Sequence, residues 1–230
     1  MNRVATIMLL ATTAASASAD LVQLEAFNNA TVQPGGPRTG GSGLAFFNIE
    51  GSDYGNFSSY GVMQFDFSGI AATYDAEFGA GNWSVENDAS FSLSQSNAFF
   101  TADGRVAFYS TMNNSNPFDT EPIYTPNGNS PFSNDYTDAM FMTTYDFVEI
   151  ADGHEDIVSF GISDFADIIT SGGVATFLIA EYDDAGVAAT WAGFENSDFA
   201  GPTLSVEVVP APGVLAVLGI AGLAGRRRRA

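Results

Sequence analysis

The most concentrated chemical groups in this sequence are carboxylates in one short segment. Asp152-Gly153-His154-Glu155-Asp156 joins three acids to the single histidine of the chain, and Asp183-Asp184 before Gly186 is the next acidic group. Calcium takes several carboxylate and carbonyl oxygens, which an acidic loop with a glycine can supply. Neither segment has the spacing of an EF-hand or of a calcium-binding nonapeptide repeat, so a solvated turn is the alternative. If calcium is a cofactor, Asp152 and Asp156 are its candidate ligands.

Catalytic constellations are absent from the residue pattern. A Ser-His-Asp triad would need His154, and no Gly-x-Ser-x-Gly motif lies near it. The chain has no cysteine, which excludes disulfides, Cys-type zinc sites and a cysteine nucleophile. Glycosidases need two carboxylates at a set separation, and among 27 acids a pair such as Asp75 with Glu77 carries no such signal. We therefore predict a non-catalytic protein with no catalytic residues.

Aromatic side chains offer a second kind of chemistry, because a ring face can stack on a sugar. The candidates for such a platform are Trp83, Trp191, Tyr60, Tyr109 and Tyr182. The alternative for each is a place in the core, which we expect for most of them, and the sequence alone assigns no binding site.

The charge of the chain is segregated. The formal net charge is −20, from 27 acids and seven basic residues that are all arginine. Every acid lies between Asp20 and Glu207, a range that holds only Arg38 and Arg105 as basic residues. Because nucleic acid is held by Lys and Arg, it is excluded as a partner, whereas cations are favoured.

The N-terminus has the three-part form of a secretory signal peptide. Arg3 precedes an apolar run from Val4 to Ala15, and the small residues Ala17-Ser18-Ala19 follow. We predict that residues 1–19 are removed by signal peptidase after Ala19. The alternative, a buried N-terminal helix, lacks an amphipathic period.

The C-terminus combines a proline motif, an apolar segment and a basic block. Pro210 and Pro212 allow a helix to begin only near Pro212, and Gly213 to Gly225 has no polar side chain before Arg226, Arg227, Arg228 and Arg229. About 14 residues make a helix of roughly 20 Å, short for a hydrocarbon core of ~30 Å. The arginines hold its end in the cytoplasm. We predict a short transmembrane helix that contacts the membrane before processing, the alternative being a core helix with a basic tail.

This tail resembles the PEP-CTERM sorting signal, a bacterial module of a Pro-Glu-Pro motif, a short hydrophobic helix and an arginine cluster. Its motif here is Val209-Pro210-Ala211-Pro212, with Ala211 where the family usually has Glu. The resemblance implies an exosortase-like membrane protease as a partner, cleavage near the prolines, and delivery to the cell envelope, outer surface or extracellular matrix. Residues 208–230 would form this signal.

Residues 20–207 are predicted to form one all-β domain, a sandwich or a barrel. Short runs alternate between apolar and polar residues and are separated by Gly, Asn, Asp, Ser and Pro. The alternating runs are 63–67, 91–94 and 204–208, and the continuous runs 106–109, 145–148 and 176–180 are candidates for central strands. Ile162, Phe165, Ile168 and Ile169 predict one short helix from Ser163 to Thr170. The proline-rich stretches Gln33 to Gly43 and Met112 to Asp138 are predicted surface loops.

The order of strand motifs between about residues 44 and 208 resembles jelly-roll domains of the DNRLRE type. The motifs are Gly61–Phe67, Ala89–Leu93, Phe108-Tyr109, Ala188–Asn196 and Pro202–Val206. The resemblance implies a jelly-roll-like antiparallel β-sandwich, and such domains occur in surface proteins and as accessory parts of carbohydrate-active enzymes. We therefore predict an exported, non-catalytic cell-surface or matrix protein. The alternative is a carbohydrate-binding module acting on exopolysaccharide, with a polysaccharide-active enzyme as a third hypothesis.

Overall fold

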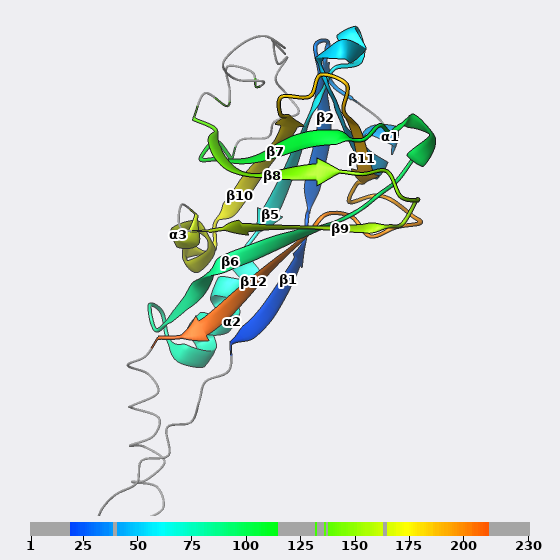
Figure 1. The fold of residues 1–230 in the computed structure, drawn as a ribbon. Coiled ribbons are helices and arrows are strands. Elements are labelled where there is room, and N and C mark those ends of the chain that lie inside the picture. Colours follow the sequence, from blue (N-terminus) through cyan, green and yellow to red (C-terminus); the bar gives the residue numbers. More distant parts are fainter. Residues whose placement is uncertain are drawn as a thin grey trace, which may run out of the picture.

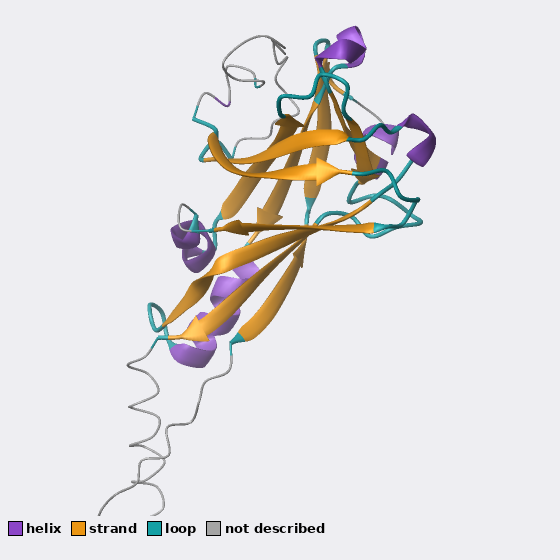
Figure 2. Cartoon of the chain, viewed as in Figure 1, coloured by secondary structure: helices purple, strands orange, loops and turns teal. Residues whose placement is uncertain are grey.

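The computed structural model describes residues 19–38, 41–114, 132, 136, 138–162 and 165–211. Within these residues, strands dominate and every ladder between them is antiparallel (Figures 1 and 2). The prediction of an all-β antiparallel sandwich is confirmed. The C-terminal helix of the prediction lies outside the described residues.

One sheet contains the two ends of the described chain. Its order is β1 (Asp20–Glu25), β12 (Thr203–Pro210), β6 (Trp83–Ser94) and β9 (Glu155–Gly161). Phe91, Leu204 and Val206 are buried, with less buried serines between them, as the predicted alternation requires. The domain was predicted to end at Glu207, and β12 continues past that residue to Pro210.

The larger sheet forms the second layer of the sandwich. Its order is β3 (Gly36–Pro37), β2 (Asn28–Gln33), β5 (Tyr60–Asp66), β10 (Val174–Glu181), β7 (Gly104–Thr111) and β8 (Met140–Phe147). Two of the predicted central runs, 106–109 and 176–180, lie on the interior strands β7 and β10. The third, 145–148, falls on and just after β8, which is an edge strand. A small ladder joins β4 (Phe46–Glu50) to β11 (Ala188–Ala192).

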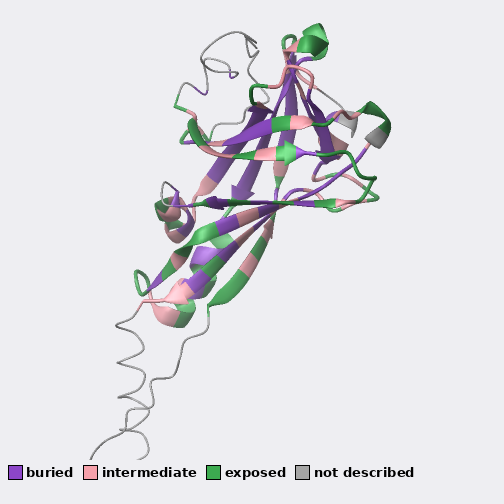
Figure 3. Ribbon diagram, in the orientation of Figure 1, coloured by how far each residue is buried: buried purple, intermediate pink, exposed green. Residues whose placement is uncertain are grey.

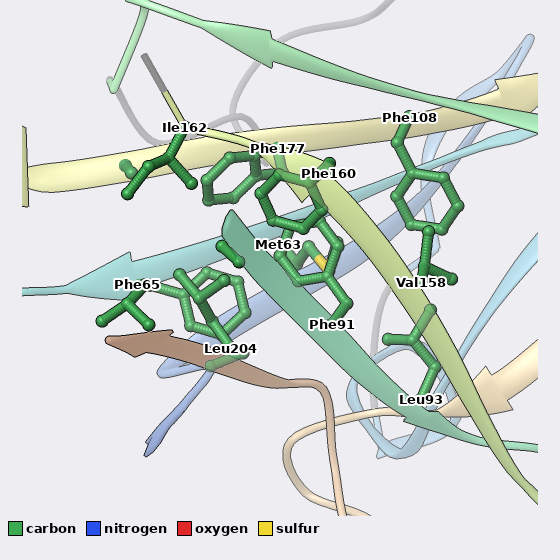
Figure 4. Packing of buried hydrophobic residues seen from close by; sticks show 14 of the residues in the cluster. Met63, Phe65, Phe91, Leu93, Phe108, Val158, Phe160, Ile162, Phe177 and Leu204 are labelled. Atoms are coloured by element: carbon green, nitrogen blue, oxygen red, sulfur yellow. The ribbon is translucent and has the colours of Figure 1, made fainter. Parts of the chain in front are cut away.

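The main core lies between the sheets and is rich in phenylalanine (Figure 4). Phe91 is fully buried at its centre, with ring centroids 4.5 Å from Phe160, 5.0 Å from Phe177 and 5.6 Å from Phe108. Rings at such distances add to the free energy gained by burying their apolar area.

The outer face of the larger sheet carries a second cluster. Tyr60, Val62 and Leu178 are buried there beneath Phe132 and Tyr136. The ring centroids of Tyr60 lie 5.3 Å from Phe132 and 6.2 Å from Tyr136. These strands are therefore buried on both faces, and in Figure 3 β5 and β10 are largely purple along their length. Two residues of the predicted surface loop Met112 to Asp138 thus belong to a core.

The helices lie at the periphery of the sheets. They are α1 (Gly41–Ala45), α2 (Ser68–Phe78), α3 (Ala166–Ser171) and the 3-10 turns Ser52–Phe57 and Ala98–Phe100. α3 corresponds to the predicted helix, although Ser163 lies outside the described residues. It ends at Gly172, whose φ of 72° is left-handed. The prediction of a single helix missed α2, because only Ile70, Ala71 and Tyr74 of that helix are buried and they leave a weak period.

The described chain begins and ends at the same end of the molecule. Asp20 pairs with Val208 in the ladder between β1 and β12 (Figure 1). β7 and β8 lie toward the opposite end. Segments that precede Ala19 or follow Ala211 therefore leave from neighbouring points.

Candidate functional site

The acidic segment around residue 156 is part of a buried hydrogen-bond network. Asp156 is 2% exposed, and its Oδ2 accepts from Trp191 Nε1 at 2.8 Å while its Oδ1 accepts from the Tyr145 hydroxyl at 2.8 Å. Gln95 Nε2 donates to both oxygens at 3.1 Å. Burial, followed by the bond to Asp156, raises the pKa of Tyr145. The carboxylate therefore ties together strands of both layers and the small ladder.

This arrangement bears on the candidate calcium ligands. The oxygens of Asp156 already accept from three donors, which a cation would have to displace, while Asp152 is exposed. His154 Nε2 lies 3.7 Å from Asp156 Oδ1. Among the described residues, no group of three or more His, Asp and Glu side chains is arranged to hold a metal ion. The geometry gives Asp156 a structural role, and calcium binding stays a prediction.

The two tryptophans among the predicted aromatic candidates lie in the core. Trp191 is fully buried, with its ring centroid 5.4 Å from Phe147. Trp83 is 5% exposed, packs at 5.5 Å from Tyr74 and donates its Nε1–H to Asp75 at 2.8 Å. Neither ring face is available to a ligand.

The other three candidates meet on the outer face of the larger sheet. A continuous row of rings runs from buried Tyr60 through Phe132 to Tyr109, and on through Phe141 to Tyr182. The ring centroids of Tyr109 and Phe141 are 5.9 Å apart, and so are those of Phe141 and Tyr182. Phe141 is 53% exposed and Tyr182 is 37% exposed, so the row emerges from the core into solvent. Burial, followed by the proximity of Tyr182, raises the pKa of Tyr109.

Strand register explains why these side chains share a face. Tyr109 pairs with Leu178 on one side and with Phe141 on the other, and the backbone of Tyr182 bonds to Arg105 O at 2.9 Å. The β7–β8 register shifts between Phe108 and Tyr109, which skips one residue of β8. On a regular strand, residues five positions apart point to opposite faces. Because one residue of β8 is skipped, Phe141 and Asp146 instead point to the same face.

A hollow adjoins the exposed end of this row. It has a volume of about 310 Å³ and is lined by Gly104, Arg105, Asp146, Phe147, Asp183 and Asp184. Arg105 Nε donates to Asp146 Oδ1 at 2.7 Å, and its Nη1 lies 3.9 Å from Asp183 Oδ2. The bond to Asp146 raises the pKa of Arg105 further. We call Tyr109, Phe141 and Tyr182, together with this hollow, the aromatic platform.

Sequence reasoning missed Phe141 and the Arg105–Asp146 pair. Residues 140–144 were not recognised as a strand for two reasons. The polar pair Thr143-Thr144 interrupts the alternation of apolar and polar residues, and the bulge shifts that alternation by one position. No pattern in the sequence marks the bulge itself.

The sorting residues are described only in part. Val209 and Pro210 end β12, where they pair with Ser84 and Trp83, and Ala211 N bonds to Asn82 O at 2.7 Å. Ala19 is exposed and directly precedes β1. Ala17, Pro212 and the arginines Arg226 to Arg229 lie outside the described residues. In the part that is described, no helix is long and apolar enough to cross a membrane.

Comparisons with known proteins give no family. No protein-family model matches the chain, and no curated protein matches it. Among solved structures, the chain is similar to the three-dimensional structure of Cocksfoot mottle virus at 2.7 Å resolution, with 12% sequence identity and a TM-score of 0.28. The alignment covers 91% of this chain and 92% of that chain. A TM-score this low carries no argument, so the site is interpreted from its own residues.

Proposed function

We propose that this chain is an exported, non-catalytic protein of the cell surface or extracellular matrix, sorted through a PEP-CTERM/exosortase-like pathway. The observation that carries the proposal is the order of its segments: a signal-peptide pattern before Asp20, and a proline motif, apolar segment and arginine block after Val208. Asp20 and Val208 are paired neighbours, so both segments leave one end of the sandwich. A domain held at that end directs β7 and β8 away from its attachment (Figure 1).

The intact mass of the protein recovered from its native envelope tests this proposal. Signal peptidase and an exosortase-like protease should together remove residues 1–19 and Arg226 to Arg229. A variant with all four of these arginines replaced by alanine should keep its tail, while Arg105→Lys, which leaves the tail unchanged, should be processed as the natural protein is. Recovery of mature protein that still contains Arg226 to Arg229 would refute processing and favour a retained anchor.

A second candidate function is carbohydrate binding, and the aromatic platform favours it. Ring faces of Phe141 and Tyr182 stand open beside charged side chains that can bond to hydroxyl groups. Extracellular polysaccharide is the ligand class that suits an exported protein. Glycan-array binding that is lost in Tyr182→Ala and kept in Phe27→Ala, an exposed ring just before β2 on the far side of the larger sheet, would support it. Equal binding by both variants would contradict it.

A further inference from the structure

We propose that the aromatic platform binds a glycan with protonated amino groups, such as a chain containing glucosamine; this inference rests on the carbohydrate-binding function proposed above. The sugar rings would stack on Phe141 and Tyr182, and their ammonium groups would lie in the adjoining hollow. Both parts of this arrangement follow from contacts of the described residues.

The stacking part comes from two neighbouring rings of different tilt. Phe141 and Tyr182 have centroids 5.9 Å apart and planes 37° apart, and both are more than a third exposed. Tyr109 supports Phe141 edge-on at an interplanar angle of 82°. Because Tyr109 is itself packed against Phe132, the exposed rings stand on a fixed base. Rigid aromatic faces of this kind give apolar contact area at a low cost in conformational entropy.

The charge of the hollow selects among sugars. Asp146, Asp183 and Asp184 line it, against the single guanidinium of Arg105. The close bond of Arg105 to Asp146 balances one carboxylate, while Asp183 lies at 3.9 Å from the guanidinium. The side chains of Asp146 and Asp183 are 73% and 65% exposed, so a ligand can reach them. An ammonium group therefore complements the hollow, and a uronic acid is repelled by it.

Backbone geometry holds the third carboxylate of the hollow, that of Asp184, in place. Asp184 Oδ1 accepts from Gly186 N at 3.2 Å, and Asp184 Oδ2 lies against Gly104. A Cβ at Gly104 would come within 2.7 Å of that oxygen and 2.6 Å of Val187 Cβ. Glycine at this position lets the loop after β10 close onto β7, which keeps Asp184 in the wall of the hollow.

Three hexamers of matched length test the inference by titration calorimetry: glucosamine, N-acetylglucosamine and galacturonic acid. The protein is purified from its native host. The titrations are run at a pH where glucosamine is protonated and exposed carboxylates are ionised. We expect the glucosamine hexamer to bind about tenfold more tightly than its N-acetylated form, because the hollow has two carboxylates in excess of its guanidinium and each contributes as an exposed ion pair does. We expect added salt to narrow the difference. The galacturonic acid hexamer should not bind.

Variants separate the two parts of the platform. Asp183→Asn should weaken glucosamine-hexamer binding about twofold to fivefold and leave the N-acetylated hexamer unaffected. Asn tolerates the left-handed backbone of residue 183, where φ is 51°, so the fold should persist, as a melting curve would verify. Tyr182→Ala should abolish binding of both hexamers. Glu207→Gln removes a charge from the other sheet and is the matched control.

The outcomes distinguish this inference from the function beneath it. Equal affinity for the two glucosamine-based hexamers, with loss of both in Tyr182→Ala, would overturn the amino-sugar inference and leave carbohydrate binding in place. Equal weakening by Glu207→Gln and Asp183→Asn would show non-specific attraction of a polycation to an acidic protein, and would overturn the inference as well. Absence of binding to any hexamer or arrayed glycan would overturn both.

Discussion

Replacing Asp156 by Ala should be one of the most damaging single changes to this fold. The variant leaves the Trp191 indole N–H and the Gln95 amide without their buried acceptor, and an unsatisfied buried donor costs about 1–3 kcal/mol. Gln95 keeps a partner in Val148 O at 2.8 Å, and the half-buried Tyr145 hydroxyl can turn to water, so Trp191 contributes most of the loss. We expect the free energy of unfolding to fall by about 2–4 kcal/mol.

Asp156→Asn refines this expectation. Its amide oxygen can accept from Trp191 while its NH₂ donates to the Tyr145 hydroxyl, which then acts as acceptor. The loss should be about 1 kcal/mol, because no buried donor is left unpaired. Exposed Asp152→Ala, four residues away, should change stability by less than about 0.5 kcal/mol.

Urea unfolding followed by tryptophan fluorescence measures all three variants, since Trp191 itself reports on the network. If Asp156→Ala and Asp152→Ala have the same midpoint, the donors around residue 156 are satisfied without the carboxylate and this reasoning is wrong. If Asp156→Asn loses as much as Asp156→Ala, the negative charge matters rather than the acceptor geometry.

Other perturbations probe the core, the pH dependence and one helix end. Phe91→Ala should cost about 3–5 kcal/mol in urea unfolding, because it opens a cavity among the rings that surround Phe91; a loss under about 1 kcal/mol would mean that the core collapses to fill it. Burial, then the 2.5 Å bond to Asp20, raises the pKa of Tyr74 to about 12. The neutral Tyr74 hydroxyl therefore stabilises the folded state fully below about pH 10, and this contribution is lost as the pH rises toward 12. Tyr74→Phe should flatten that alkaline slope, and an unchanged slope would assign it to other groups. Gly172→Ala should cost about 1–2 kcal/mol in the same assay, because φ is 72° and the new Cβ would meet Ala71 Cβ at 3.0 Å. Gly69→Ala, in open space on α2, should be neutral or stabilising. Equal effects of the two substitutions would contradict this account.

The parts of the fold that sequence predicts are those where local pattern and tertiary packing agree. Leu204 and Val206 alternate with polar residues and lie in the core, and α3 ends at Ser171, one residue after the predicted end at Thr170. α2 escaped prediction because its buried positions are few. Gln64 alternates with the core residues of β5 and so lies on the outer face of the larger sheet, where the pattern predicts exposure. It is only 3% exposed, and its Nε2 donates to Thr176 Oγ1 at 3.1 Å.

The candidate site depends on relations that sequence does not express. Asp156 occurs in an acidic run that suggests a solvated turn, and only the strand period of β9 turns it inward toward Trp191. Tyr109 and Tyr182 are far apart along the chain, and their meeting follows from the pairing of β7 with β10. The β-bulge that turns Phe141 to the same face leaves no mark in the residue order.

The position of β12 has a mechanical consequence. It lies between β1 and β6 and ends at Pro210, so a pull on Ala211 acts along the strand axis. Hydrogen bonds in antiparallel ladders lie perpendicular to the strands, and a lengthwise pull shears the bonds on both sides together instead of opening them one after another. A chain tethered through this end would resist extraction under flow, because its point of attachment is an interior strand that is hydrogen-bonded on both sides.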